Sequence, residues 1–141
     1  MKLVVDASVS LKWFMTERVD EQNVAEALLV GEQIAQGRFE LFSPPHWIAE
    51  VISVLARLDP PAIDGALRIF SDLNGATLRD LKTMRHAADL AVSLKAHLFD
   101  TLYHAVALET GATLVTADDR YFAKARGEGS ILMLQDFKAA P

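Results

Sequence analysis

The chain has 141 residues, enough for one domain with a sizeable core but not for two. It contains no cysteine, which excludes a disulfide framework and a thiolate zinc site. The formal net charge of −5 argues against a non-specific electrostatic grip on nucleic acid, and no apolar stretch approaches the roughly 20 residues of a membrane span.

Short apolar runs alternate with amphipathic segments along the chain. In order, the sequence predicts a strand over 2–6, a helix capped by Ser8, a helix over 20–36, a strand over 39–42, a helix over 44–58, a helix over 62–73, a weak strand over 77–81, helices over 84–96 and 101–110, a strand over 112–116, a short helix over 117–125 and a last strand over 131–134. This alternation indicates an α/β fold with a mainly parallel sheet, and we expect a single domain over 1–141. Periodicity turns Leu28, Leu58 and Leu67 toward the core.

Four carboxylates stand where a parallel sheet would gather them at one edge. Asp6 ends the apolar run 3–5, and Asp118 follows the run 114–116, so both lie at carboxyl ends of strands, the usual ligand side of an open α/β sheet. Glu50 interrupts the apolar face of its helix, and Asp100 stands just before a helical run. Clustered like charges need protons or a cation, and oxygen ligands favour Mg²⁺ or Mn²⁺.

Three of these acids also have an ordinary structural role open to them. Glu50 can lie at the rim and pair with Arg57, while Asp100 and Asp118 can each cap the helix that follows. Asp119 adjoins Asp118, and we expect only one of the two to point inward. Strand alternation with Thr116 favours Asp118.

Hydroxyl and basic side chains lie near the acids in the sequence. Ser8 and Thr116 can orient carboxylates or serve as ordinary caps. The four histidines show no metal-binding spacing on one helix, and we expect them to be exposed or half-buried. Four basic residues are candidates for phosphate contacts, although a solvated basic face explains some of them as well: Lys12, Arg120, Lys124 and Arg126.

Four segments together resemble the PIN-domain family, and within it ribonuclease toxins of the VapC type. They are residues 3–9, the helix over 44–58 with Glu50, residues 99–107 and the strand end 114–118, in that order across nearly the whole chain. The resemblance implies a single three-layer α/β/α domain with a central mainly parallel sheet, and Mg²⁺- or Mn²⁺-dependent cleavage of RNA. One departure is Ser53, where many relatives carry Asn.

By this resemblance Asp6, Glu50, Asp100 and Asp118 occupy the acidic positions, and Thr116 matches the hydroxyl that commonly precedes the last acid. The implied mechanism is metal-assisted hydrolysis at phosphorus with one or two ions. Asp6 and Asp100 are then direct ligands, Asp118 ligates directly or through water, and Glu50 holds a second ion or orients the nucleophile. The resemblance also implies a small antitoxin partner and a homodimer. The three-residue apolar run near the N-terminus predicts no signal peptide, hence a cytoplasmic protein.

Other classes of protein fit less well or remain as rivals. A phosphatase of the haloacid-dehalogenase type needs a second Asp two residues after Asp6, where this chain has Ser8. A receiver-like phosphorylation switch needs a lysine near the last strands, and no lysine stands directly after the apolar run of such a strand. The main alternative is a non-catalytic module of the same fold that holds RNA or protein. The complete acidic set favours the enzyme.

Overall fold

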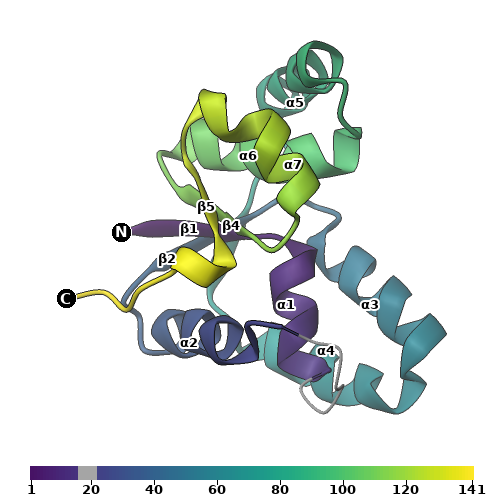
Figure 1. The fold of residues 1–141 in the computed structure, drawn as a ribbon. Helices are drawn as coiled ribbons and strands as arrows, with labels where there is room; N and C mark the ends of the chain where they lie inside the picture. The colour runs from purple at the N-terminus through teal and green to yellow at the C-terminus, as the bar shows by residue number, and fades with distance from the viewer. Residues whose placement is uncertain (16–21) are drawn as a thin grey trace.

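The computed structural model describes residues 1–15 and 22–141, and a parallel sheet lies at its centre (Figure 1). The strands are β1 (Lys2–Val5), β2 (Glu40–Ser43), β3 (Gly75–Thr77), β4 (Thr113–Thr116) and β5 (Ile131–Met133). Their order across the sheet is β3-β2-β1-β4-β5, and each neighbouring pair is parallel. The predicted α/β fold with a mainly parallel sheet is therefore confirmed.

Helices cover both faces of the sheet, which gives the three layers expected (Figure 1). The helices of the described residues are α1 (Ala7–Phe14), α2 (Val24–Ala35), α3 (Trp47–Leu58), α4 (Ile63–Asp72), α5 (Leu81–Leu94), α6 (Leu98–Thr110) and α7 (Asp119–Ala125), with short 3₁₀ turns at Pro60–Ala62, Arg126–Glu128 and Leu134–Asp136. In Figure 1 α5, α6 and α7 lie on one side of the sheet and α1 to α4 on the other. The centre of the molecule is apolar because β1 and β4 bury nearly all their side chains.

The chain adds strands on one side of β1 first and then on the other side, so the strand order changes direction between β1 and β4. The chain builds outward from β1 through β2 to β3, and then returns to lay β4 against the other side of β1. Val5 pairs with Val115, and the backbone N–H of Asp6 donates to the carbonyl of Val115 at 3.0 Å. In open parallel sheets such a switch point opens a crevice outside the carboxyl ends of the strands. Asp6 and Asp118 follow these two strands directly.

Several element boundaries differ from the predictions. The third strand occupies 75–77, not 77–81. Its side chains are exposed and carry no apolar pattern, so its pairing with β2 alone defines it as a strand. Asp6 caps α1 by accepting from the N–H of Ser8, so Ser8 is not the cap. Helix α6 begins at Leu98 with His97 as its cap, which places Asp100 in the first turn and excludes Asp100 as the cap.

Further corrections concern helix ends and burial. Helix α3 begins at Trp47, three residues after the predicted start, and α2 begins at Val24; residues 20 and 21 of the predicted helix lie outside the described residues. Leu28, Leu58 and Leu67, which the sequence assigns to the core, are about half exposed. Each lies outside the stripe of side chains that its helix, α2, α3 or α4, buries.

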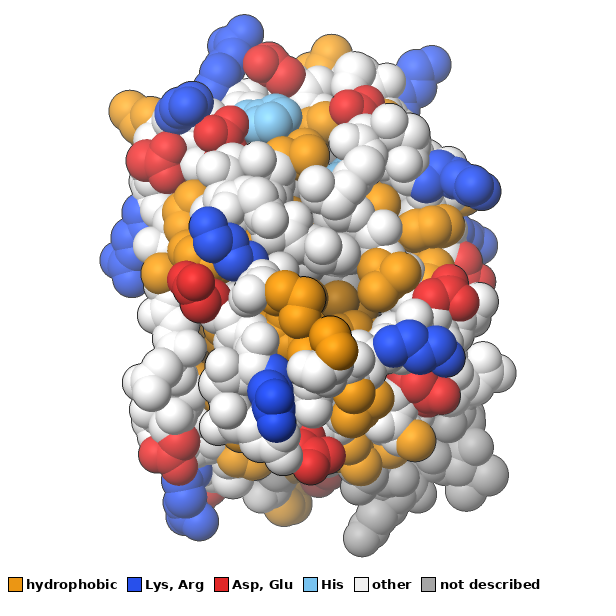
Figure 2. All heavy atoms as spheres, turned by 90° about the vertical axis from the view of Figure 1, so that its left-hand side faces the viewer, with side chains coloured by type: hydrophobic (Ala, Val, Ile, Leu, Met, Phe, Trp, Pro, Cys, Tyr) orange, Lys and Arg blue, Asp and Glu red, His pale blue; other side chains and the backbone are white. Residues whose placement is uncertain are grey.

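The face at the amino ends of the strands has no single sign of charge. Figure 2 shows apolar side chains gathered near the middle of this face, with Lys, Arg, Asp and Glu interspersed around them. Among the described residues no helix is long and apolar enough to cross a membrane.

Candidate functional site

Asp6 is held in place by hydroxyl groups from two strand ends. Its Oδ2 accepts from the Ser8 hydroxyl, from the Ser8 N–H at 3.4 Å and from the Thr116 hydroxyl at 3.2 Å. Its Oδ1 has no hydrogen-bond partner among the described residues. One oxygen is thus fixed by the protein, and the other remains available to a ligand.

The same two hydroxyls tie the ends of β1 and β4 together. The Ser8 hydroxyl accepts from the N–H of Ala117 at 3.0 Å, and the Thr116 hydroxyl accepts from the N–H of Asp118 at 3.1 Å. Each hydroxyl therefore donates to Asp6 and accepts from the backbone that leads to Asp118. These contacts fix the orientation of the Asp6 carboxylate and the backbone path that leads to Asp118.

Asp6 and Asp100 bear the electrostatic cost of this cluster. Burial raises the pKa of Asp6 to about 6; the Ser8 hydrogen bond opposes this, and the charges of Glu50 and Asp100 add to it. Burial likewise raises the pKa of Asp100, followed by the charges of Asp118 and Glu50. Like charges in a partly buried crevice disfavour ionisation, so a cation placed among them would be stabilised.

Glu50 reaches the site from α3 and is held from α6. The hydroxyl of Tyr103, a residue with no solvent exposure, donates to Glu50 Oε2 at 2.8 Å. His46 lies one turn earlier on the chain, with Nε2 at 3.4 Å from the same oxygen. The alternative pairing of Glu50 with Arg57 is not formed. Burial lowers the pKa of His46, so the neutral ring predominates at neutral pH.

Asp100 and Asp118 face a cavity that Asp6 also lines. Asp6, Asp100 and Asp118 border one small cavity together with Leu114, Thr116 and Tyr121. Asp118 also caps α7 through Oδ1, which accepts from the N–H of Tyr121 at 3.0 Å. Its capping role and a place in the cluster are thus compatible.

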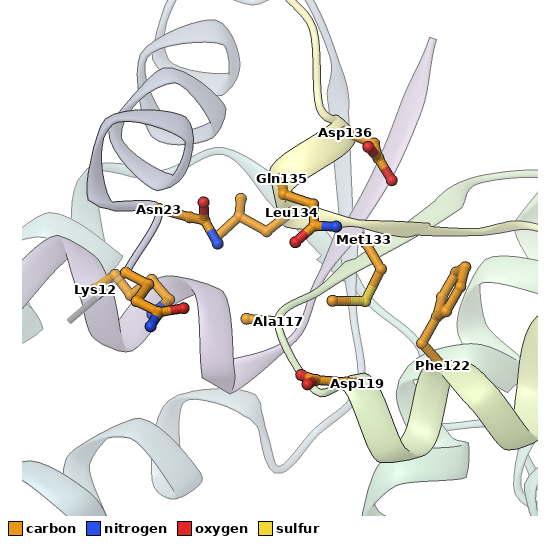
Figure 3. A pocket seen from close by; sticks show the side chains of 10 residues that line it. Lys12, Asn23, Ala117, Asp119, Phe122, Met133, Leu134, Gln135 and Asp136 are labelled. Carbon is orange, nitrogen blue, oxygen red and sulfur yellow. The ribbon is translucent and has the colours of Figure 1, made fainter. Parts of the chain in front are cut away.

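Asp119 lies in a different pocket (Figure 3). There it borders a cavity of about 370 Å³ with Lys12, Ala117, Phe122 and Met133, while Asp118 borders the cavity of Asp6. The two neighbouring acids therefore diverge, in the sense that strand alternation predicts.

A buried histidine secures the wall of the acidic cavity. His104 is fully buried, which corrects the expectation of exposed or half-buried histidines. Its Nε2 donates to the carbonyl of Gly129 at 2.8 Å, so Nδ1 accepts from the hydroxyl of Tyr121 at 2.9 Å. Burial lowers the pKa of His104. The hydrogen bond with His104 fixes Tyr121 at the wall of the cavity that Asp6, Asp100 and Asp118 border.

The four basic candidates lie in three different places. Arg120 and Lys124 border a pocket of about 270 Å³ with Asp100 and Asp118, so the fold brings these two beside the acids. Lys12 lines the neighbouring pocket of Asp119. Arg126 instead lies over the ring of Phe122, 5.8 Å from its centroid.

The pocket of Arg120 also contains two residues that the sequence reading missed. Lys95 and His97 border it, from the loop before α6. A lysine and a histidine shortly before Asp100 were the available signal in the sequence. They place further potential positive charge beside the acids.

The donor set fits a hard divalent cation. Three carboxylates border one cavity, Asp6 keeps a free oxygen, and among the described residues no Lys or Arg lies within ion-pair distance of Asp6, Glu50, Asp100 or Asp118. In the part of the chain that the structure describes, no three acidic or histidine side chains are already close enough to form a finished metal site. Oxygen-only ligands of this kind suit Mg²⁺ or Mn²⁺.

Fold and site together define an α/β/α protein with an acidic crevice at the switch point of a parallel sheet. The chain belongs to the PIN-domain family: the family model described as PIN domain matches residues 3–128. Comparison with curated protein sequences gave no significant match.

Solved structures of the same fold cover nearly the whole chain. PAE2754 from Pyrobaculum aerophilum is 24% identical with a TM-score of 0.64, over 96% of this chain and 90% of that one. VapBC-1 from nontypeable Haemophilus influenzae is 16% identical with a TM-score of 0.67, over 96% of this chain and 100% of that one. VapBC2 from Rickettsia felis, bound to a DNA fragment from its promoter, is 16% identical with a TM-score of 0.66, over 94% of this chain and 97% of that one.

Proposed function

We propose that this protein is a metal-dependent endoribonuclease and the toxin of a toxin–antitoxin pair. The observation that carries the proposal is the state of Asp6. Three protein donors occupy its Oδ2, Oδ1 has no partner among the described residues, and no described Lys or Arg forms an ion pair with the acids around it. A carboxylate with one oxygen held by the protein and the other unpaired is suited to bind a metal ion. Membership of the PIN-domain family supports a nuclease.

Asp6, Asp100 and Asp118 would hold Mg²⁺ or Mn²⁺, with Glu50 at the edge of the same cluster. When bound, such an ion lowers the pKa of a water molecule and offsets charge on the phosphate. Ser8 and Thr116 keep Asp6 in a fixed orientation while the substrate binds. The Tyr103 hydroxyl occupies one oxygen of Glu50 and leaves the other to orient the attacking water.

Arg120 and Lys124 bind the phosphates that flank the cleaved bond. Both border the pocket that contains Asp100 and Asp118, so their charges act where the strand must approach the acids. A chain of net charge −5 repels RNA overall, and local cations are needed to hold it. Attack in line at phosphorus leaves a 5′-phosphate and a 3′-hydroxyl end.

A small antitoxin is the proposed partner, and the toxin forms a homodimer. The fold is shared over nearly its full length with chains from VapBC complexes. A basic side chain of the antitoxin would pair with Asp6 or Asp118 and displace the metal. Inhibition that survives neutralisation of every basic residue of the antitoxin peptide contradicts this charge competition. A strictly monomeric protein in light scattering at high concentration contradicts the dimer.

The central experiment measures cleavage of a mixed RNA pool in Mg²⁺ or Mn²⁺, with EDTA as the metal control. We expect Asp6→Asn and Asp100→Asn to abolish cleavage while circular dichroism shows an intact fold, because an amide is a poor substitute for a charged oxygen ligand. Asp119→Asn is the matched control, since Asp119 is the adjacent acid that borders a different pocket. Wild-type turnover in Asp6→Asn or Asp100→Asn removes that residue from the ligand set. Tight RNA binding without cleavage favours the non-catalytic alternative.

A further inference from the structure

Four rings form a continuous series from the protein surface to Glu50. The ring centroids of His97 and Phe99 are 5.2 Å apart, those of Phe99 and His46 are 5.1 Å apart, and those of His46 and Tyr103 are 4.8 Å apart. The Tyr103 hydroxyl then donates to Glu50. The series therefore leads from the protein surface to one carboxylate of the acidic cluster.

Phe99 is the exposed apolar ring in this series, and hydrogen bonds with His46 and His97 hold its backbone. His46 Nε2 donates to the carbonyl of Phe99 at 2.9 Å, and the N–H of Phe99 donates to His97 Nδ1 at 3.3 Å. The rings of His46 and Phe99 are inclined by only 30°. Even so, 52% of Phe99 is exposed. An ordered aromatic side chain is thus presented to solvent directly before Asp100.

The surface around Phe99 continues into the basic pocket. His97 contacts the Phe99 ring and also borders the pocket that holds Arg120, Lys124 and Asp100. Around Phe99 and the adjacent Asp100 the surface therefore offers a flat apolar ring, cations that can bind phosphates and carboxylates that can bind metal. A single nucleic-acid strand presents the complementary groups, a base and the phosphate attached to its sugar.

Resting on the function proposed above, we propose that Phe99 is the stacking platform for an unpaired base next to the cleaved phosphate. The base lies on the exposed part of the ring, its phosphate turns toward Arg120 and Lys124, and the bond to be cut lies beside the acids that border the same pocket. Aromatic stacking accepts any base but requires an unstacked one, so the site selects single-stranded over duplex RNA. His46 and His97 act as positioning residues that hold the ring.

The test is a binding titration of single-stranded oligoribonucleotides that carry 2-aminopurine at successive positions, in EDTA to prevent cleavage. In the wild type we expect quenching at one or two positions, as stacking on a ring produces. Phe99→Ala should weaken binding about five- to 100-fold and remove the quenching, and Phe99→Trp should restore both. Because Phe99 is half exposed, its truncation leaves the core intact. Val92→Ala is the matched control, since Val92 is an 80% exposed apolar side chain on α5.

Cleavage assays on the same variants separate the possible failures. If the wild type cuts RNA and Phe99→Ala binds and cuts with unchanged KM, the stacking inference is overturned and the proposed function stands. Loss of antitoxin binding by Phe99→Ala without any change in RNA affinity also overturns it, and assigns the ring to a protein contact. If the wild type neither binds nor cuts RNA under any metal condition, the proposed function itself fails.

Discussion

Replacing Asp6 by Asn should stabilise the metal-free protein at neutral pH. The side chain is isosteric, and asparagine serves as a helix cap as well as aspartate does, so its amide oxygen can keep the hydrogen bonds from Ser8 and Thr116. The change removes a carboxylate whose ionisation the fold opposes through burial and through the charges of Glu50 and Asp100. A stability gain is therefore the expected result.

The size of the gain follows from the pKa of Asp6, which rises from 3.8 to about 6 on folding. At about 1.4 kcal/mol per pH unit, this displacement corresponds to about 3 kcal/mol. A raised carboxyl pKa means that the folded state binds the proton more tightly than the unfolded state. The destabilisation is consequently full above pH 6 and fades as the pH falls toward 4. The stability difference between variant and wild type should shrink from about 3 kcal/mol at pH 7.5 to about 1.6 kcal/mol at pH 5.

The assay is urea unfolding of both proteins in EDTA at pH 7.5, 6 and 5, followed by circular dichroism. The difference between the two proteins is the quantity to compare, because His46 and His104, whose pKa values are lowered by burial, affect both in the same pH window. Asp119→Asn again serves as the control, because it removes the adjacent acid, which borders a different pocket. A constant difference between Asp6→Asn and wild type across this range would refute the reasoning.

Three further predictions concern metal, RNA and the hydroxyl link. Mg²⁺ at 100 times its Kd should stabilise the wild type by about 2.7 kcal/mol, measured as a higher Tm, and should stabilise Asp6→Asn far less. Equal shifts in Tm for the two proteins would show that the metal does not bind in this crevice. Arg120→Ala should raise KM and flatten the slope of log affinity against log salt by about 0.7 without changing metal affinity. Unchanged kinetics and an unchanged salt slope would show that Arg120 is a solvated surface residue that does not contact RNA. Thr116→Val should cost about 1–3 kcal/mol in urea unfolding and lower kcat, because it removes a donor to Asp6 and leaves the N–H of Asp118 unpaired; wild-type stability and turnover would show that the hydroxyl is dispensable.

The parts of the fold that sequence predicts are those encoded by local pattern. The β-branched runs of β1 and β4 are continuous and apolar because both faces of these strands are buried, and the position of Asp6 follows from where the first run ends. The strand at 75–77 has no such pattern. It consists of exposed Gly-Ala-Thr, and only its pairing with β2 makes it a strand. Gly75 suits that pairing because a Cβ there would lie 3.1 Å from the carbonyl oxygen of Leu41.

The candidate site divides in the same way. The four acids could be named because each interrupts or ends an apolar pattern. The contacts that control them could not, because they join residues far apart in the sequence. Tyr103 looks like a core residue by periodicity, yet its hydroxyl binds Glu50, 53 positions earlier. His46 and Phe99 are also 53 residues apart, and neither shows in its own segment that the two rings meet.

The hydroxyl link between the first and fourth strands also determines when a growing chain can become active. The ribosome makes Asp6 well before Thr116, whose hydroxyl orients it and which lies 110 residues later in the chain. At about 5–20 residues per second, the ribosome needs roughly 6–22 s to cover that interval. Throughout it, the nascent chain carries its first acid without the strand that completes the crevice. A protein that cuts RNA would thus be harmless to its own message until the fourth strand has been made, and an inhibitor could be produced during the same interval.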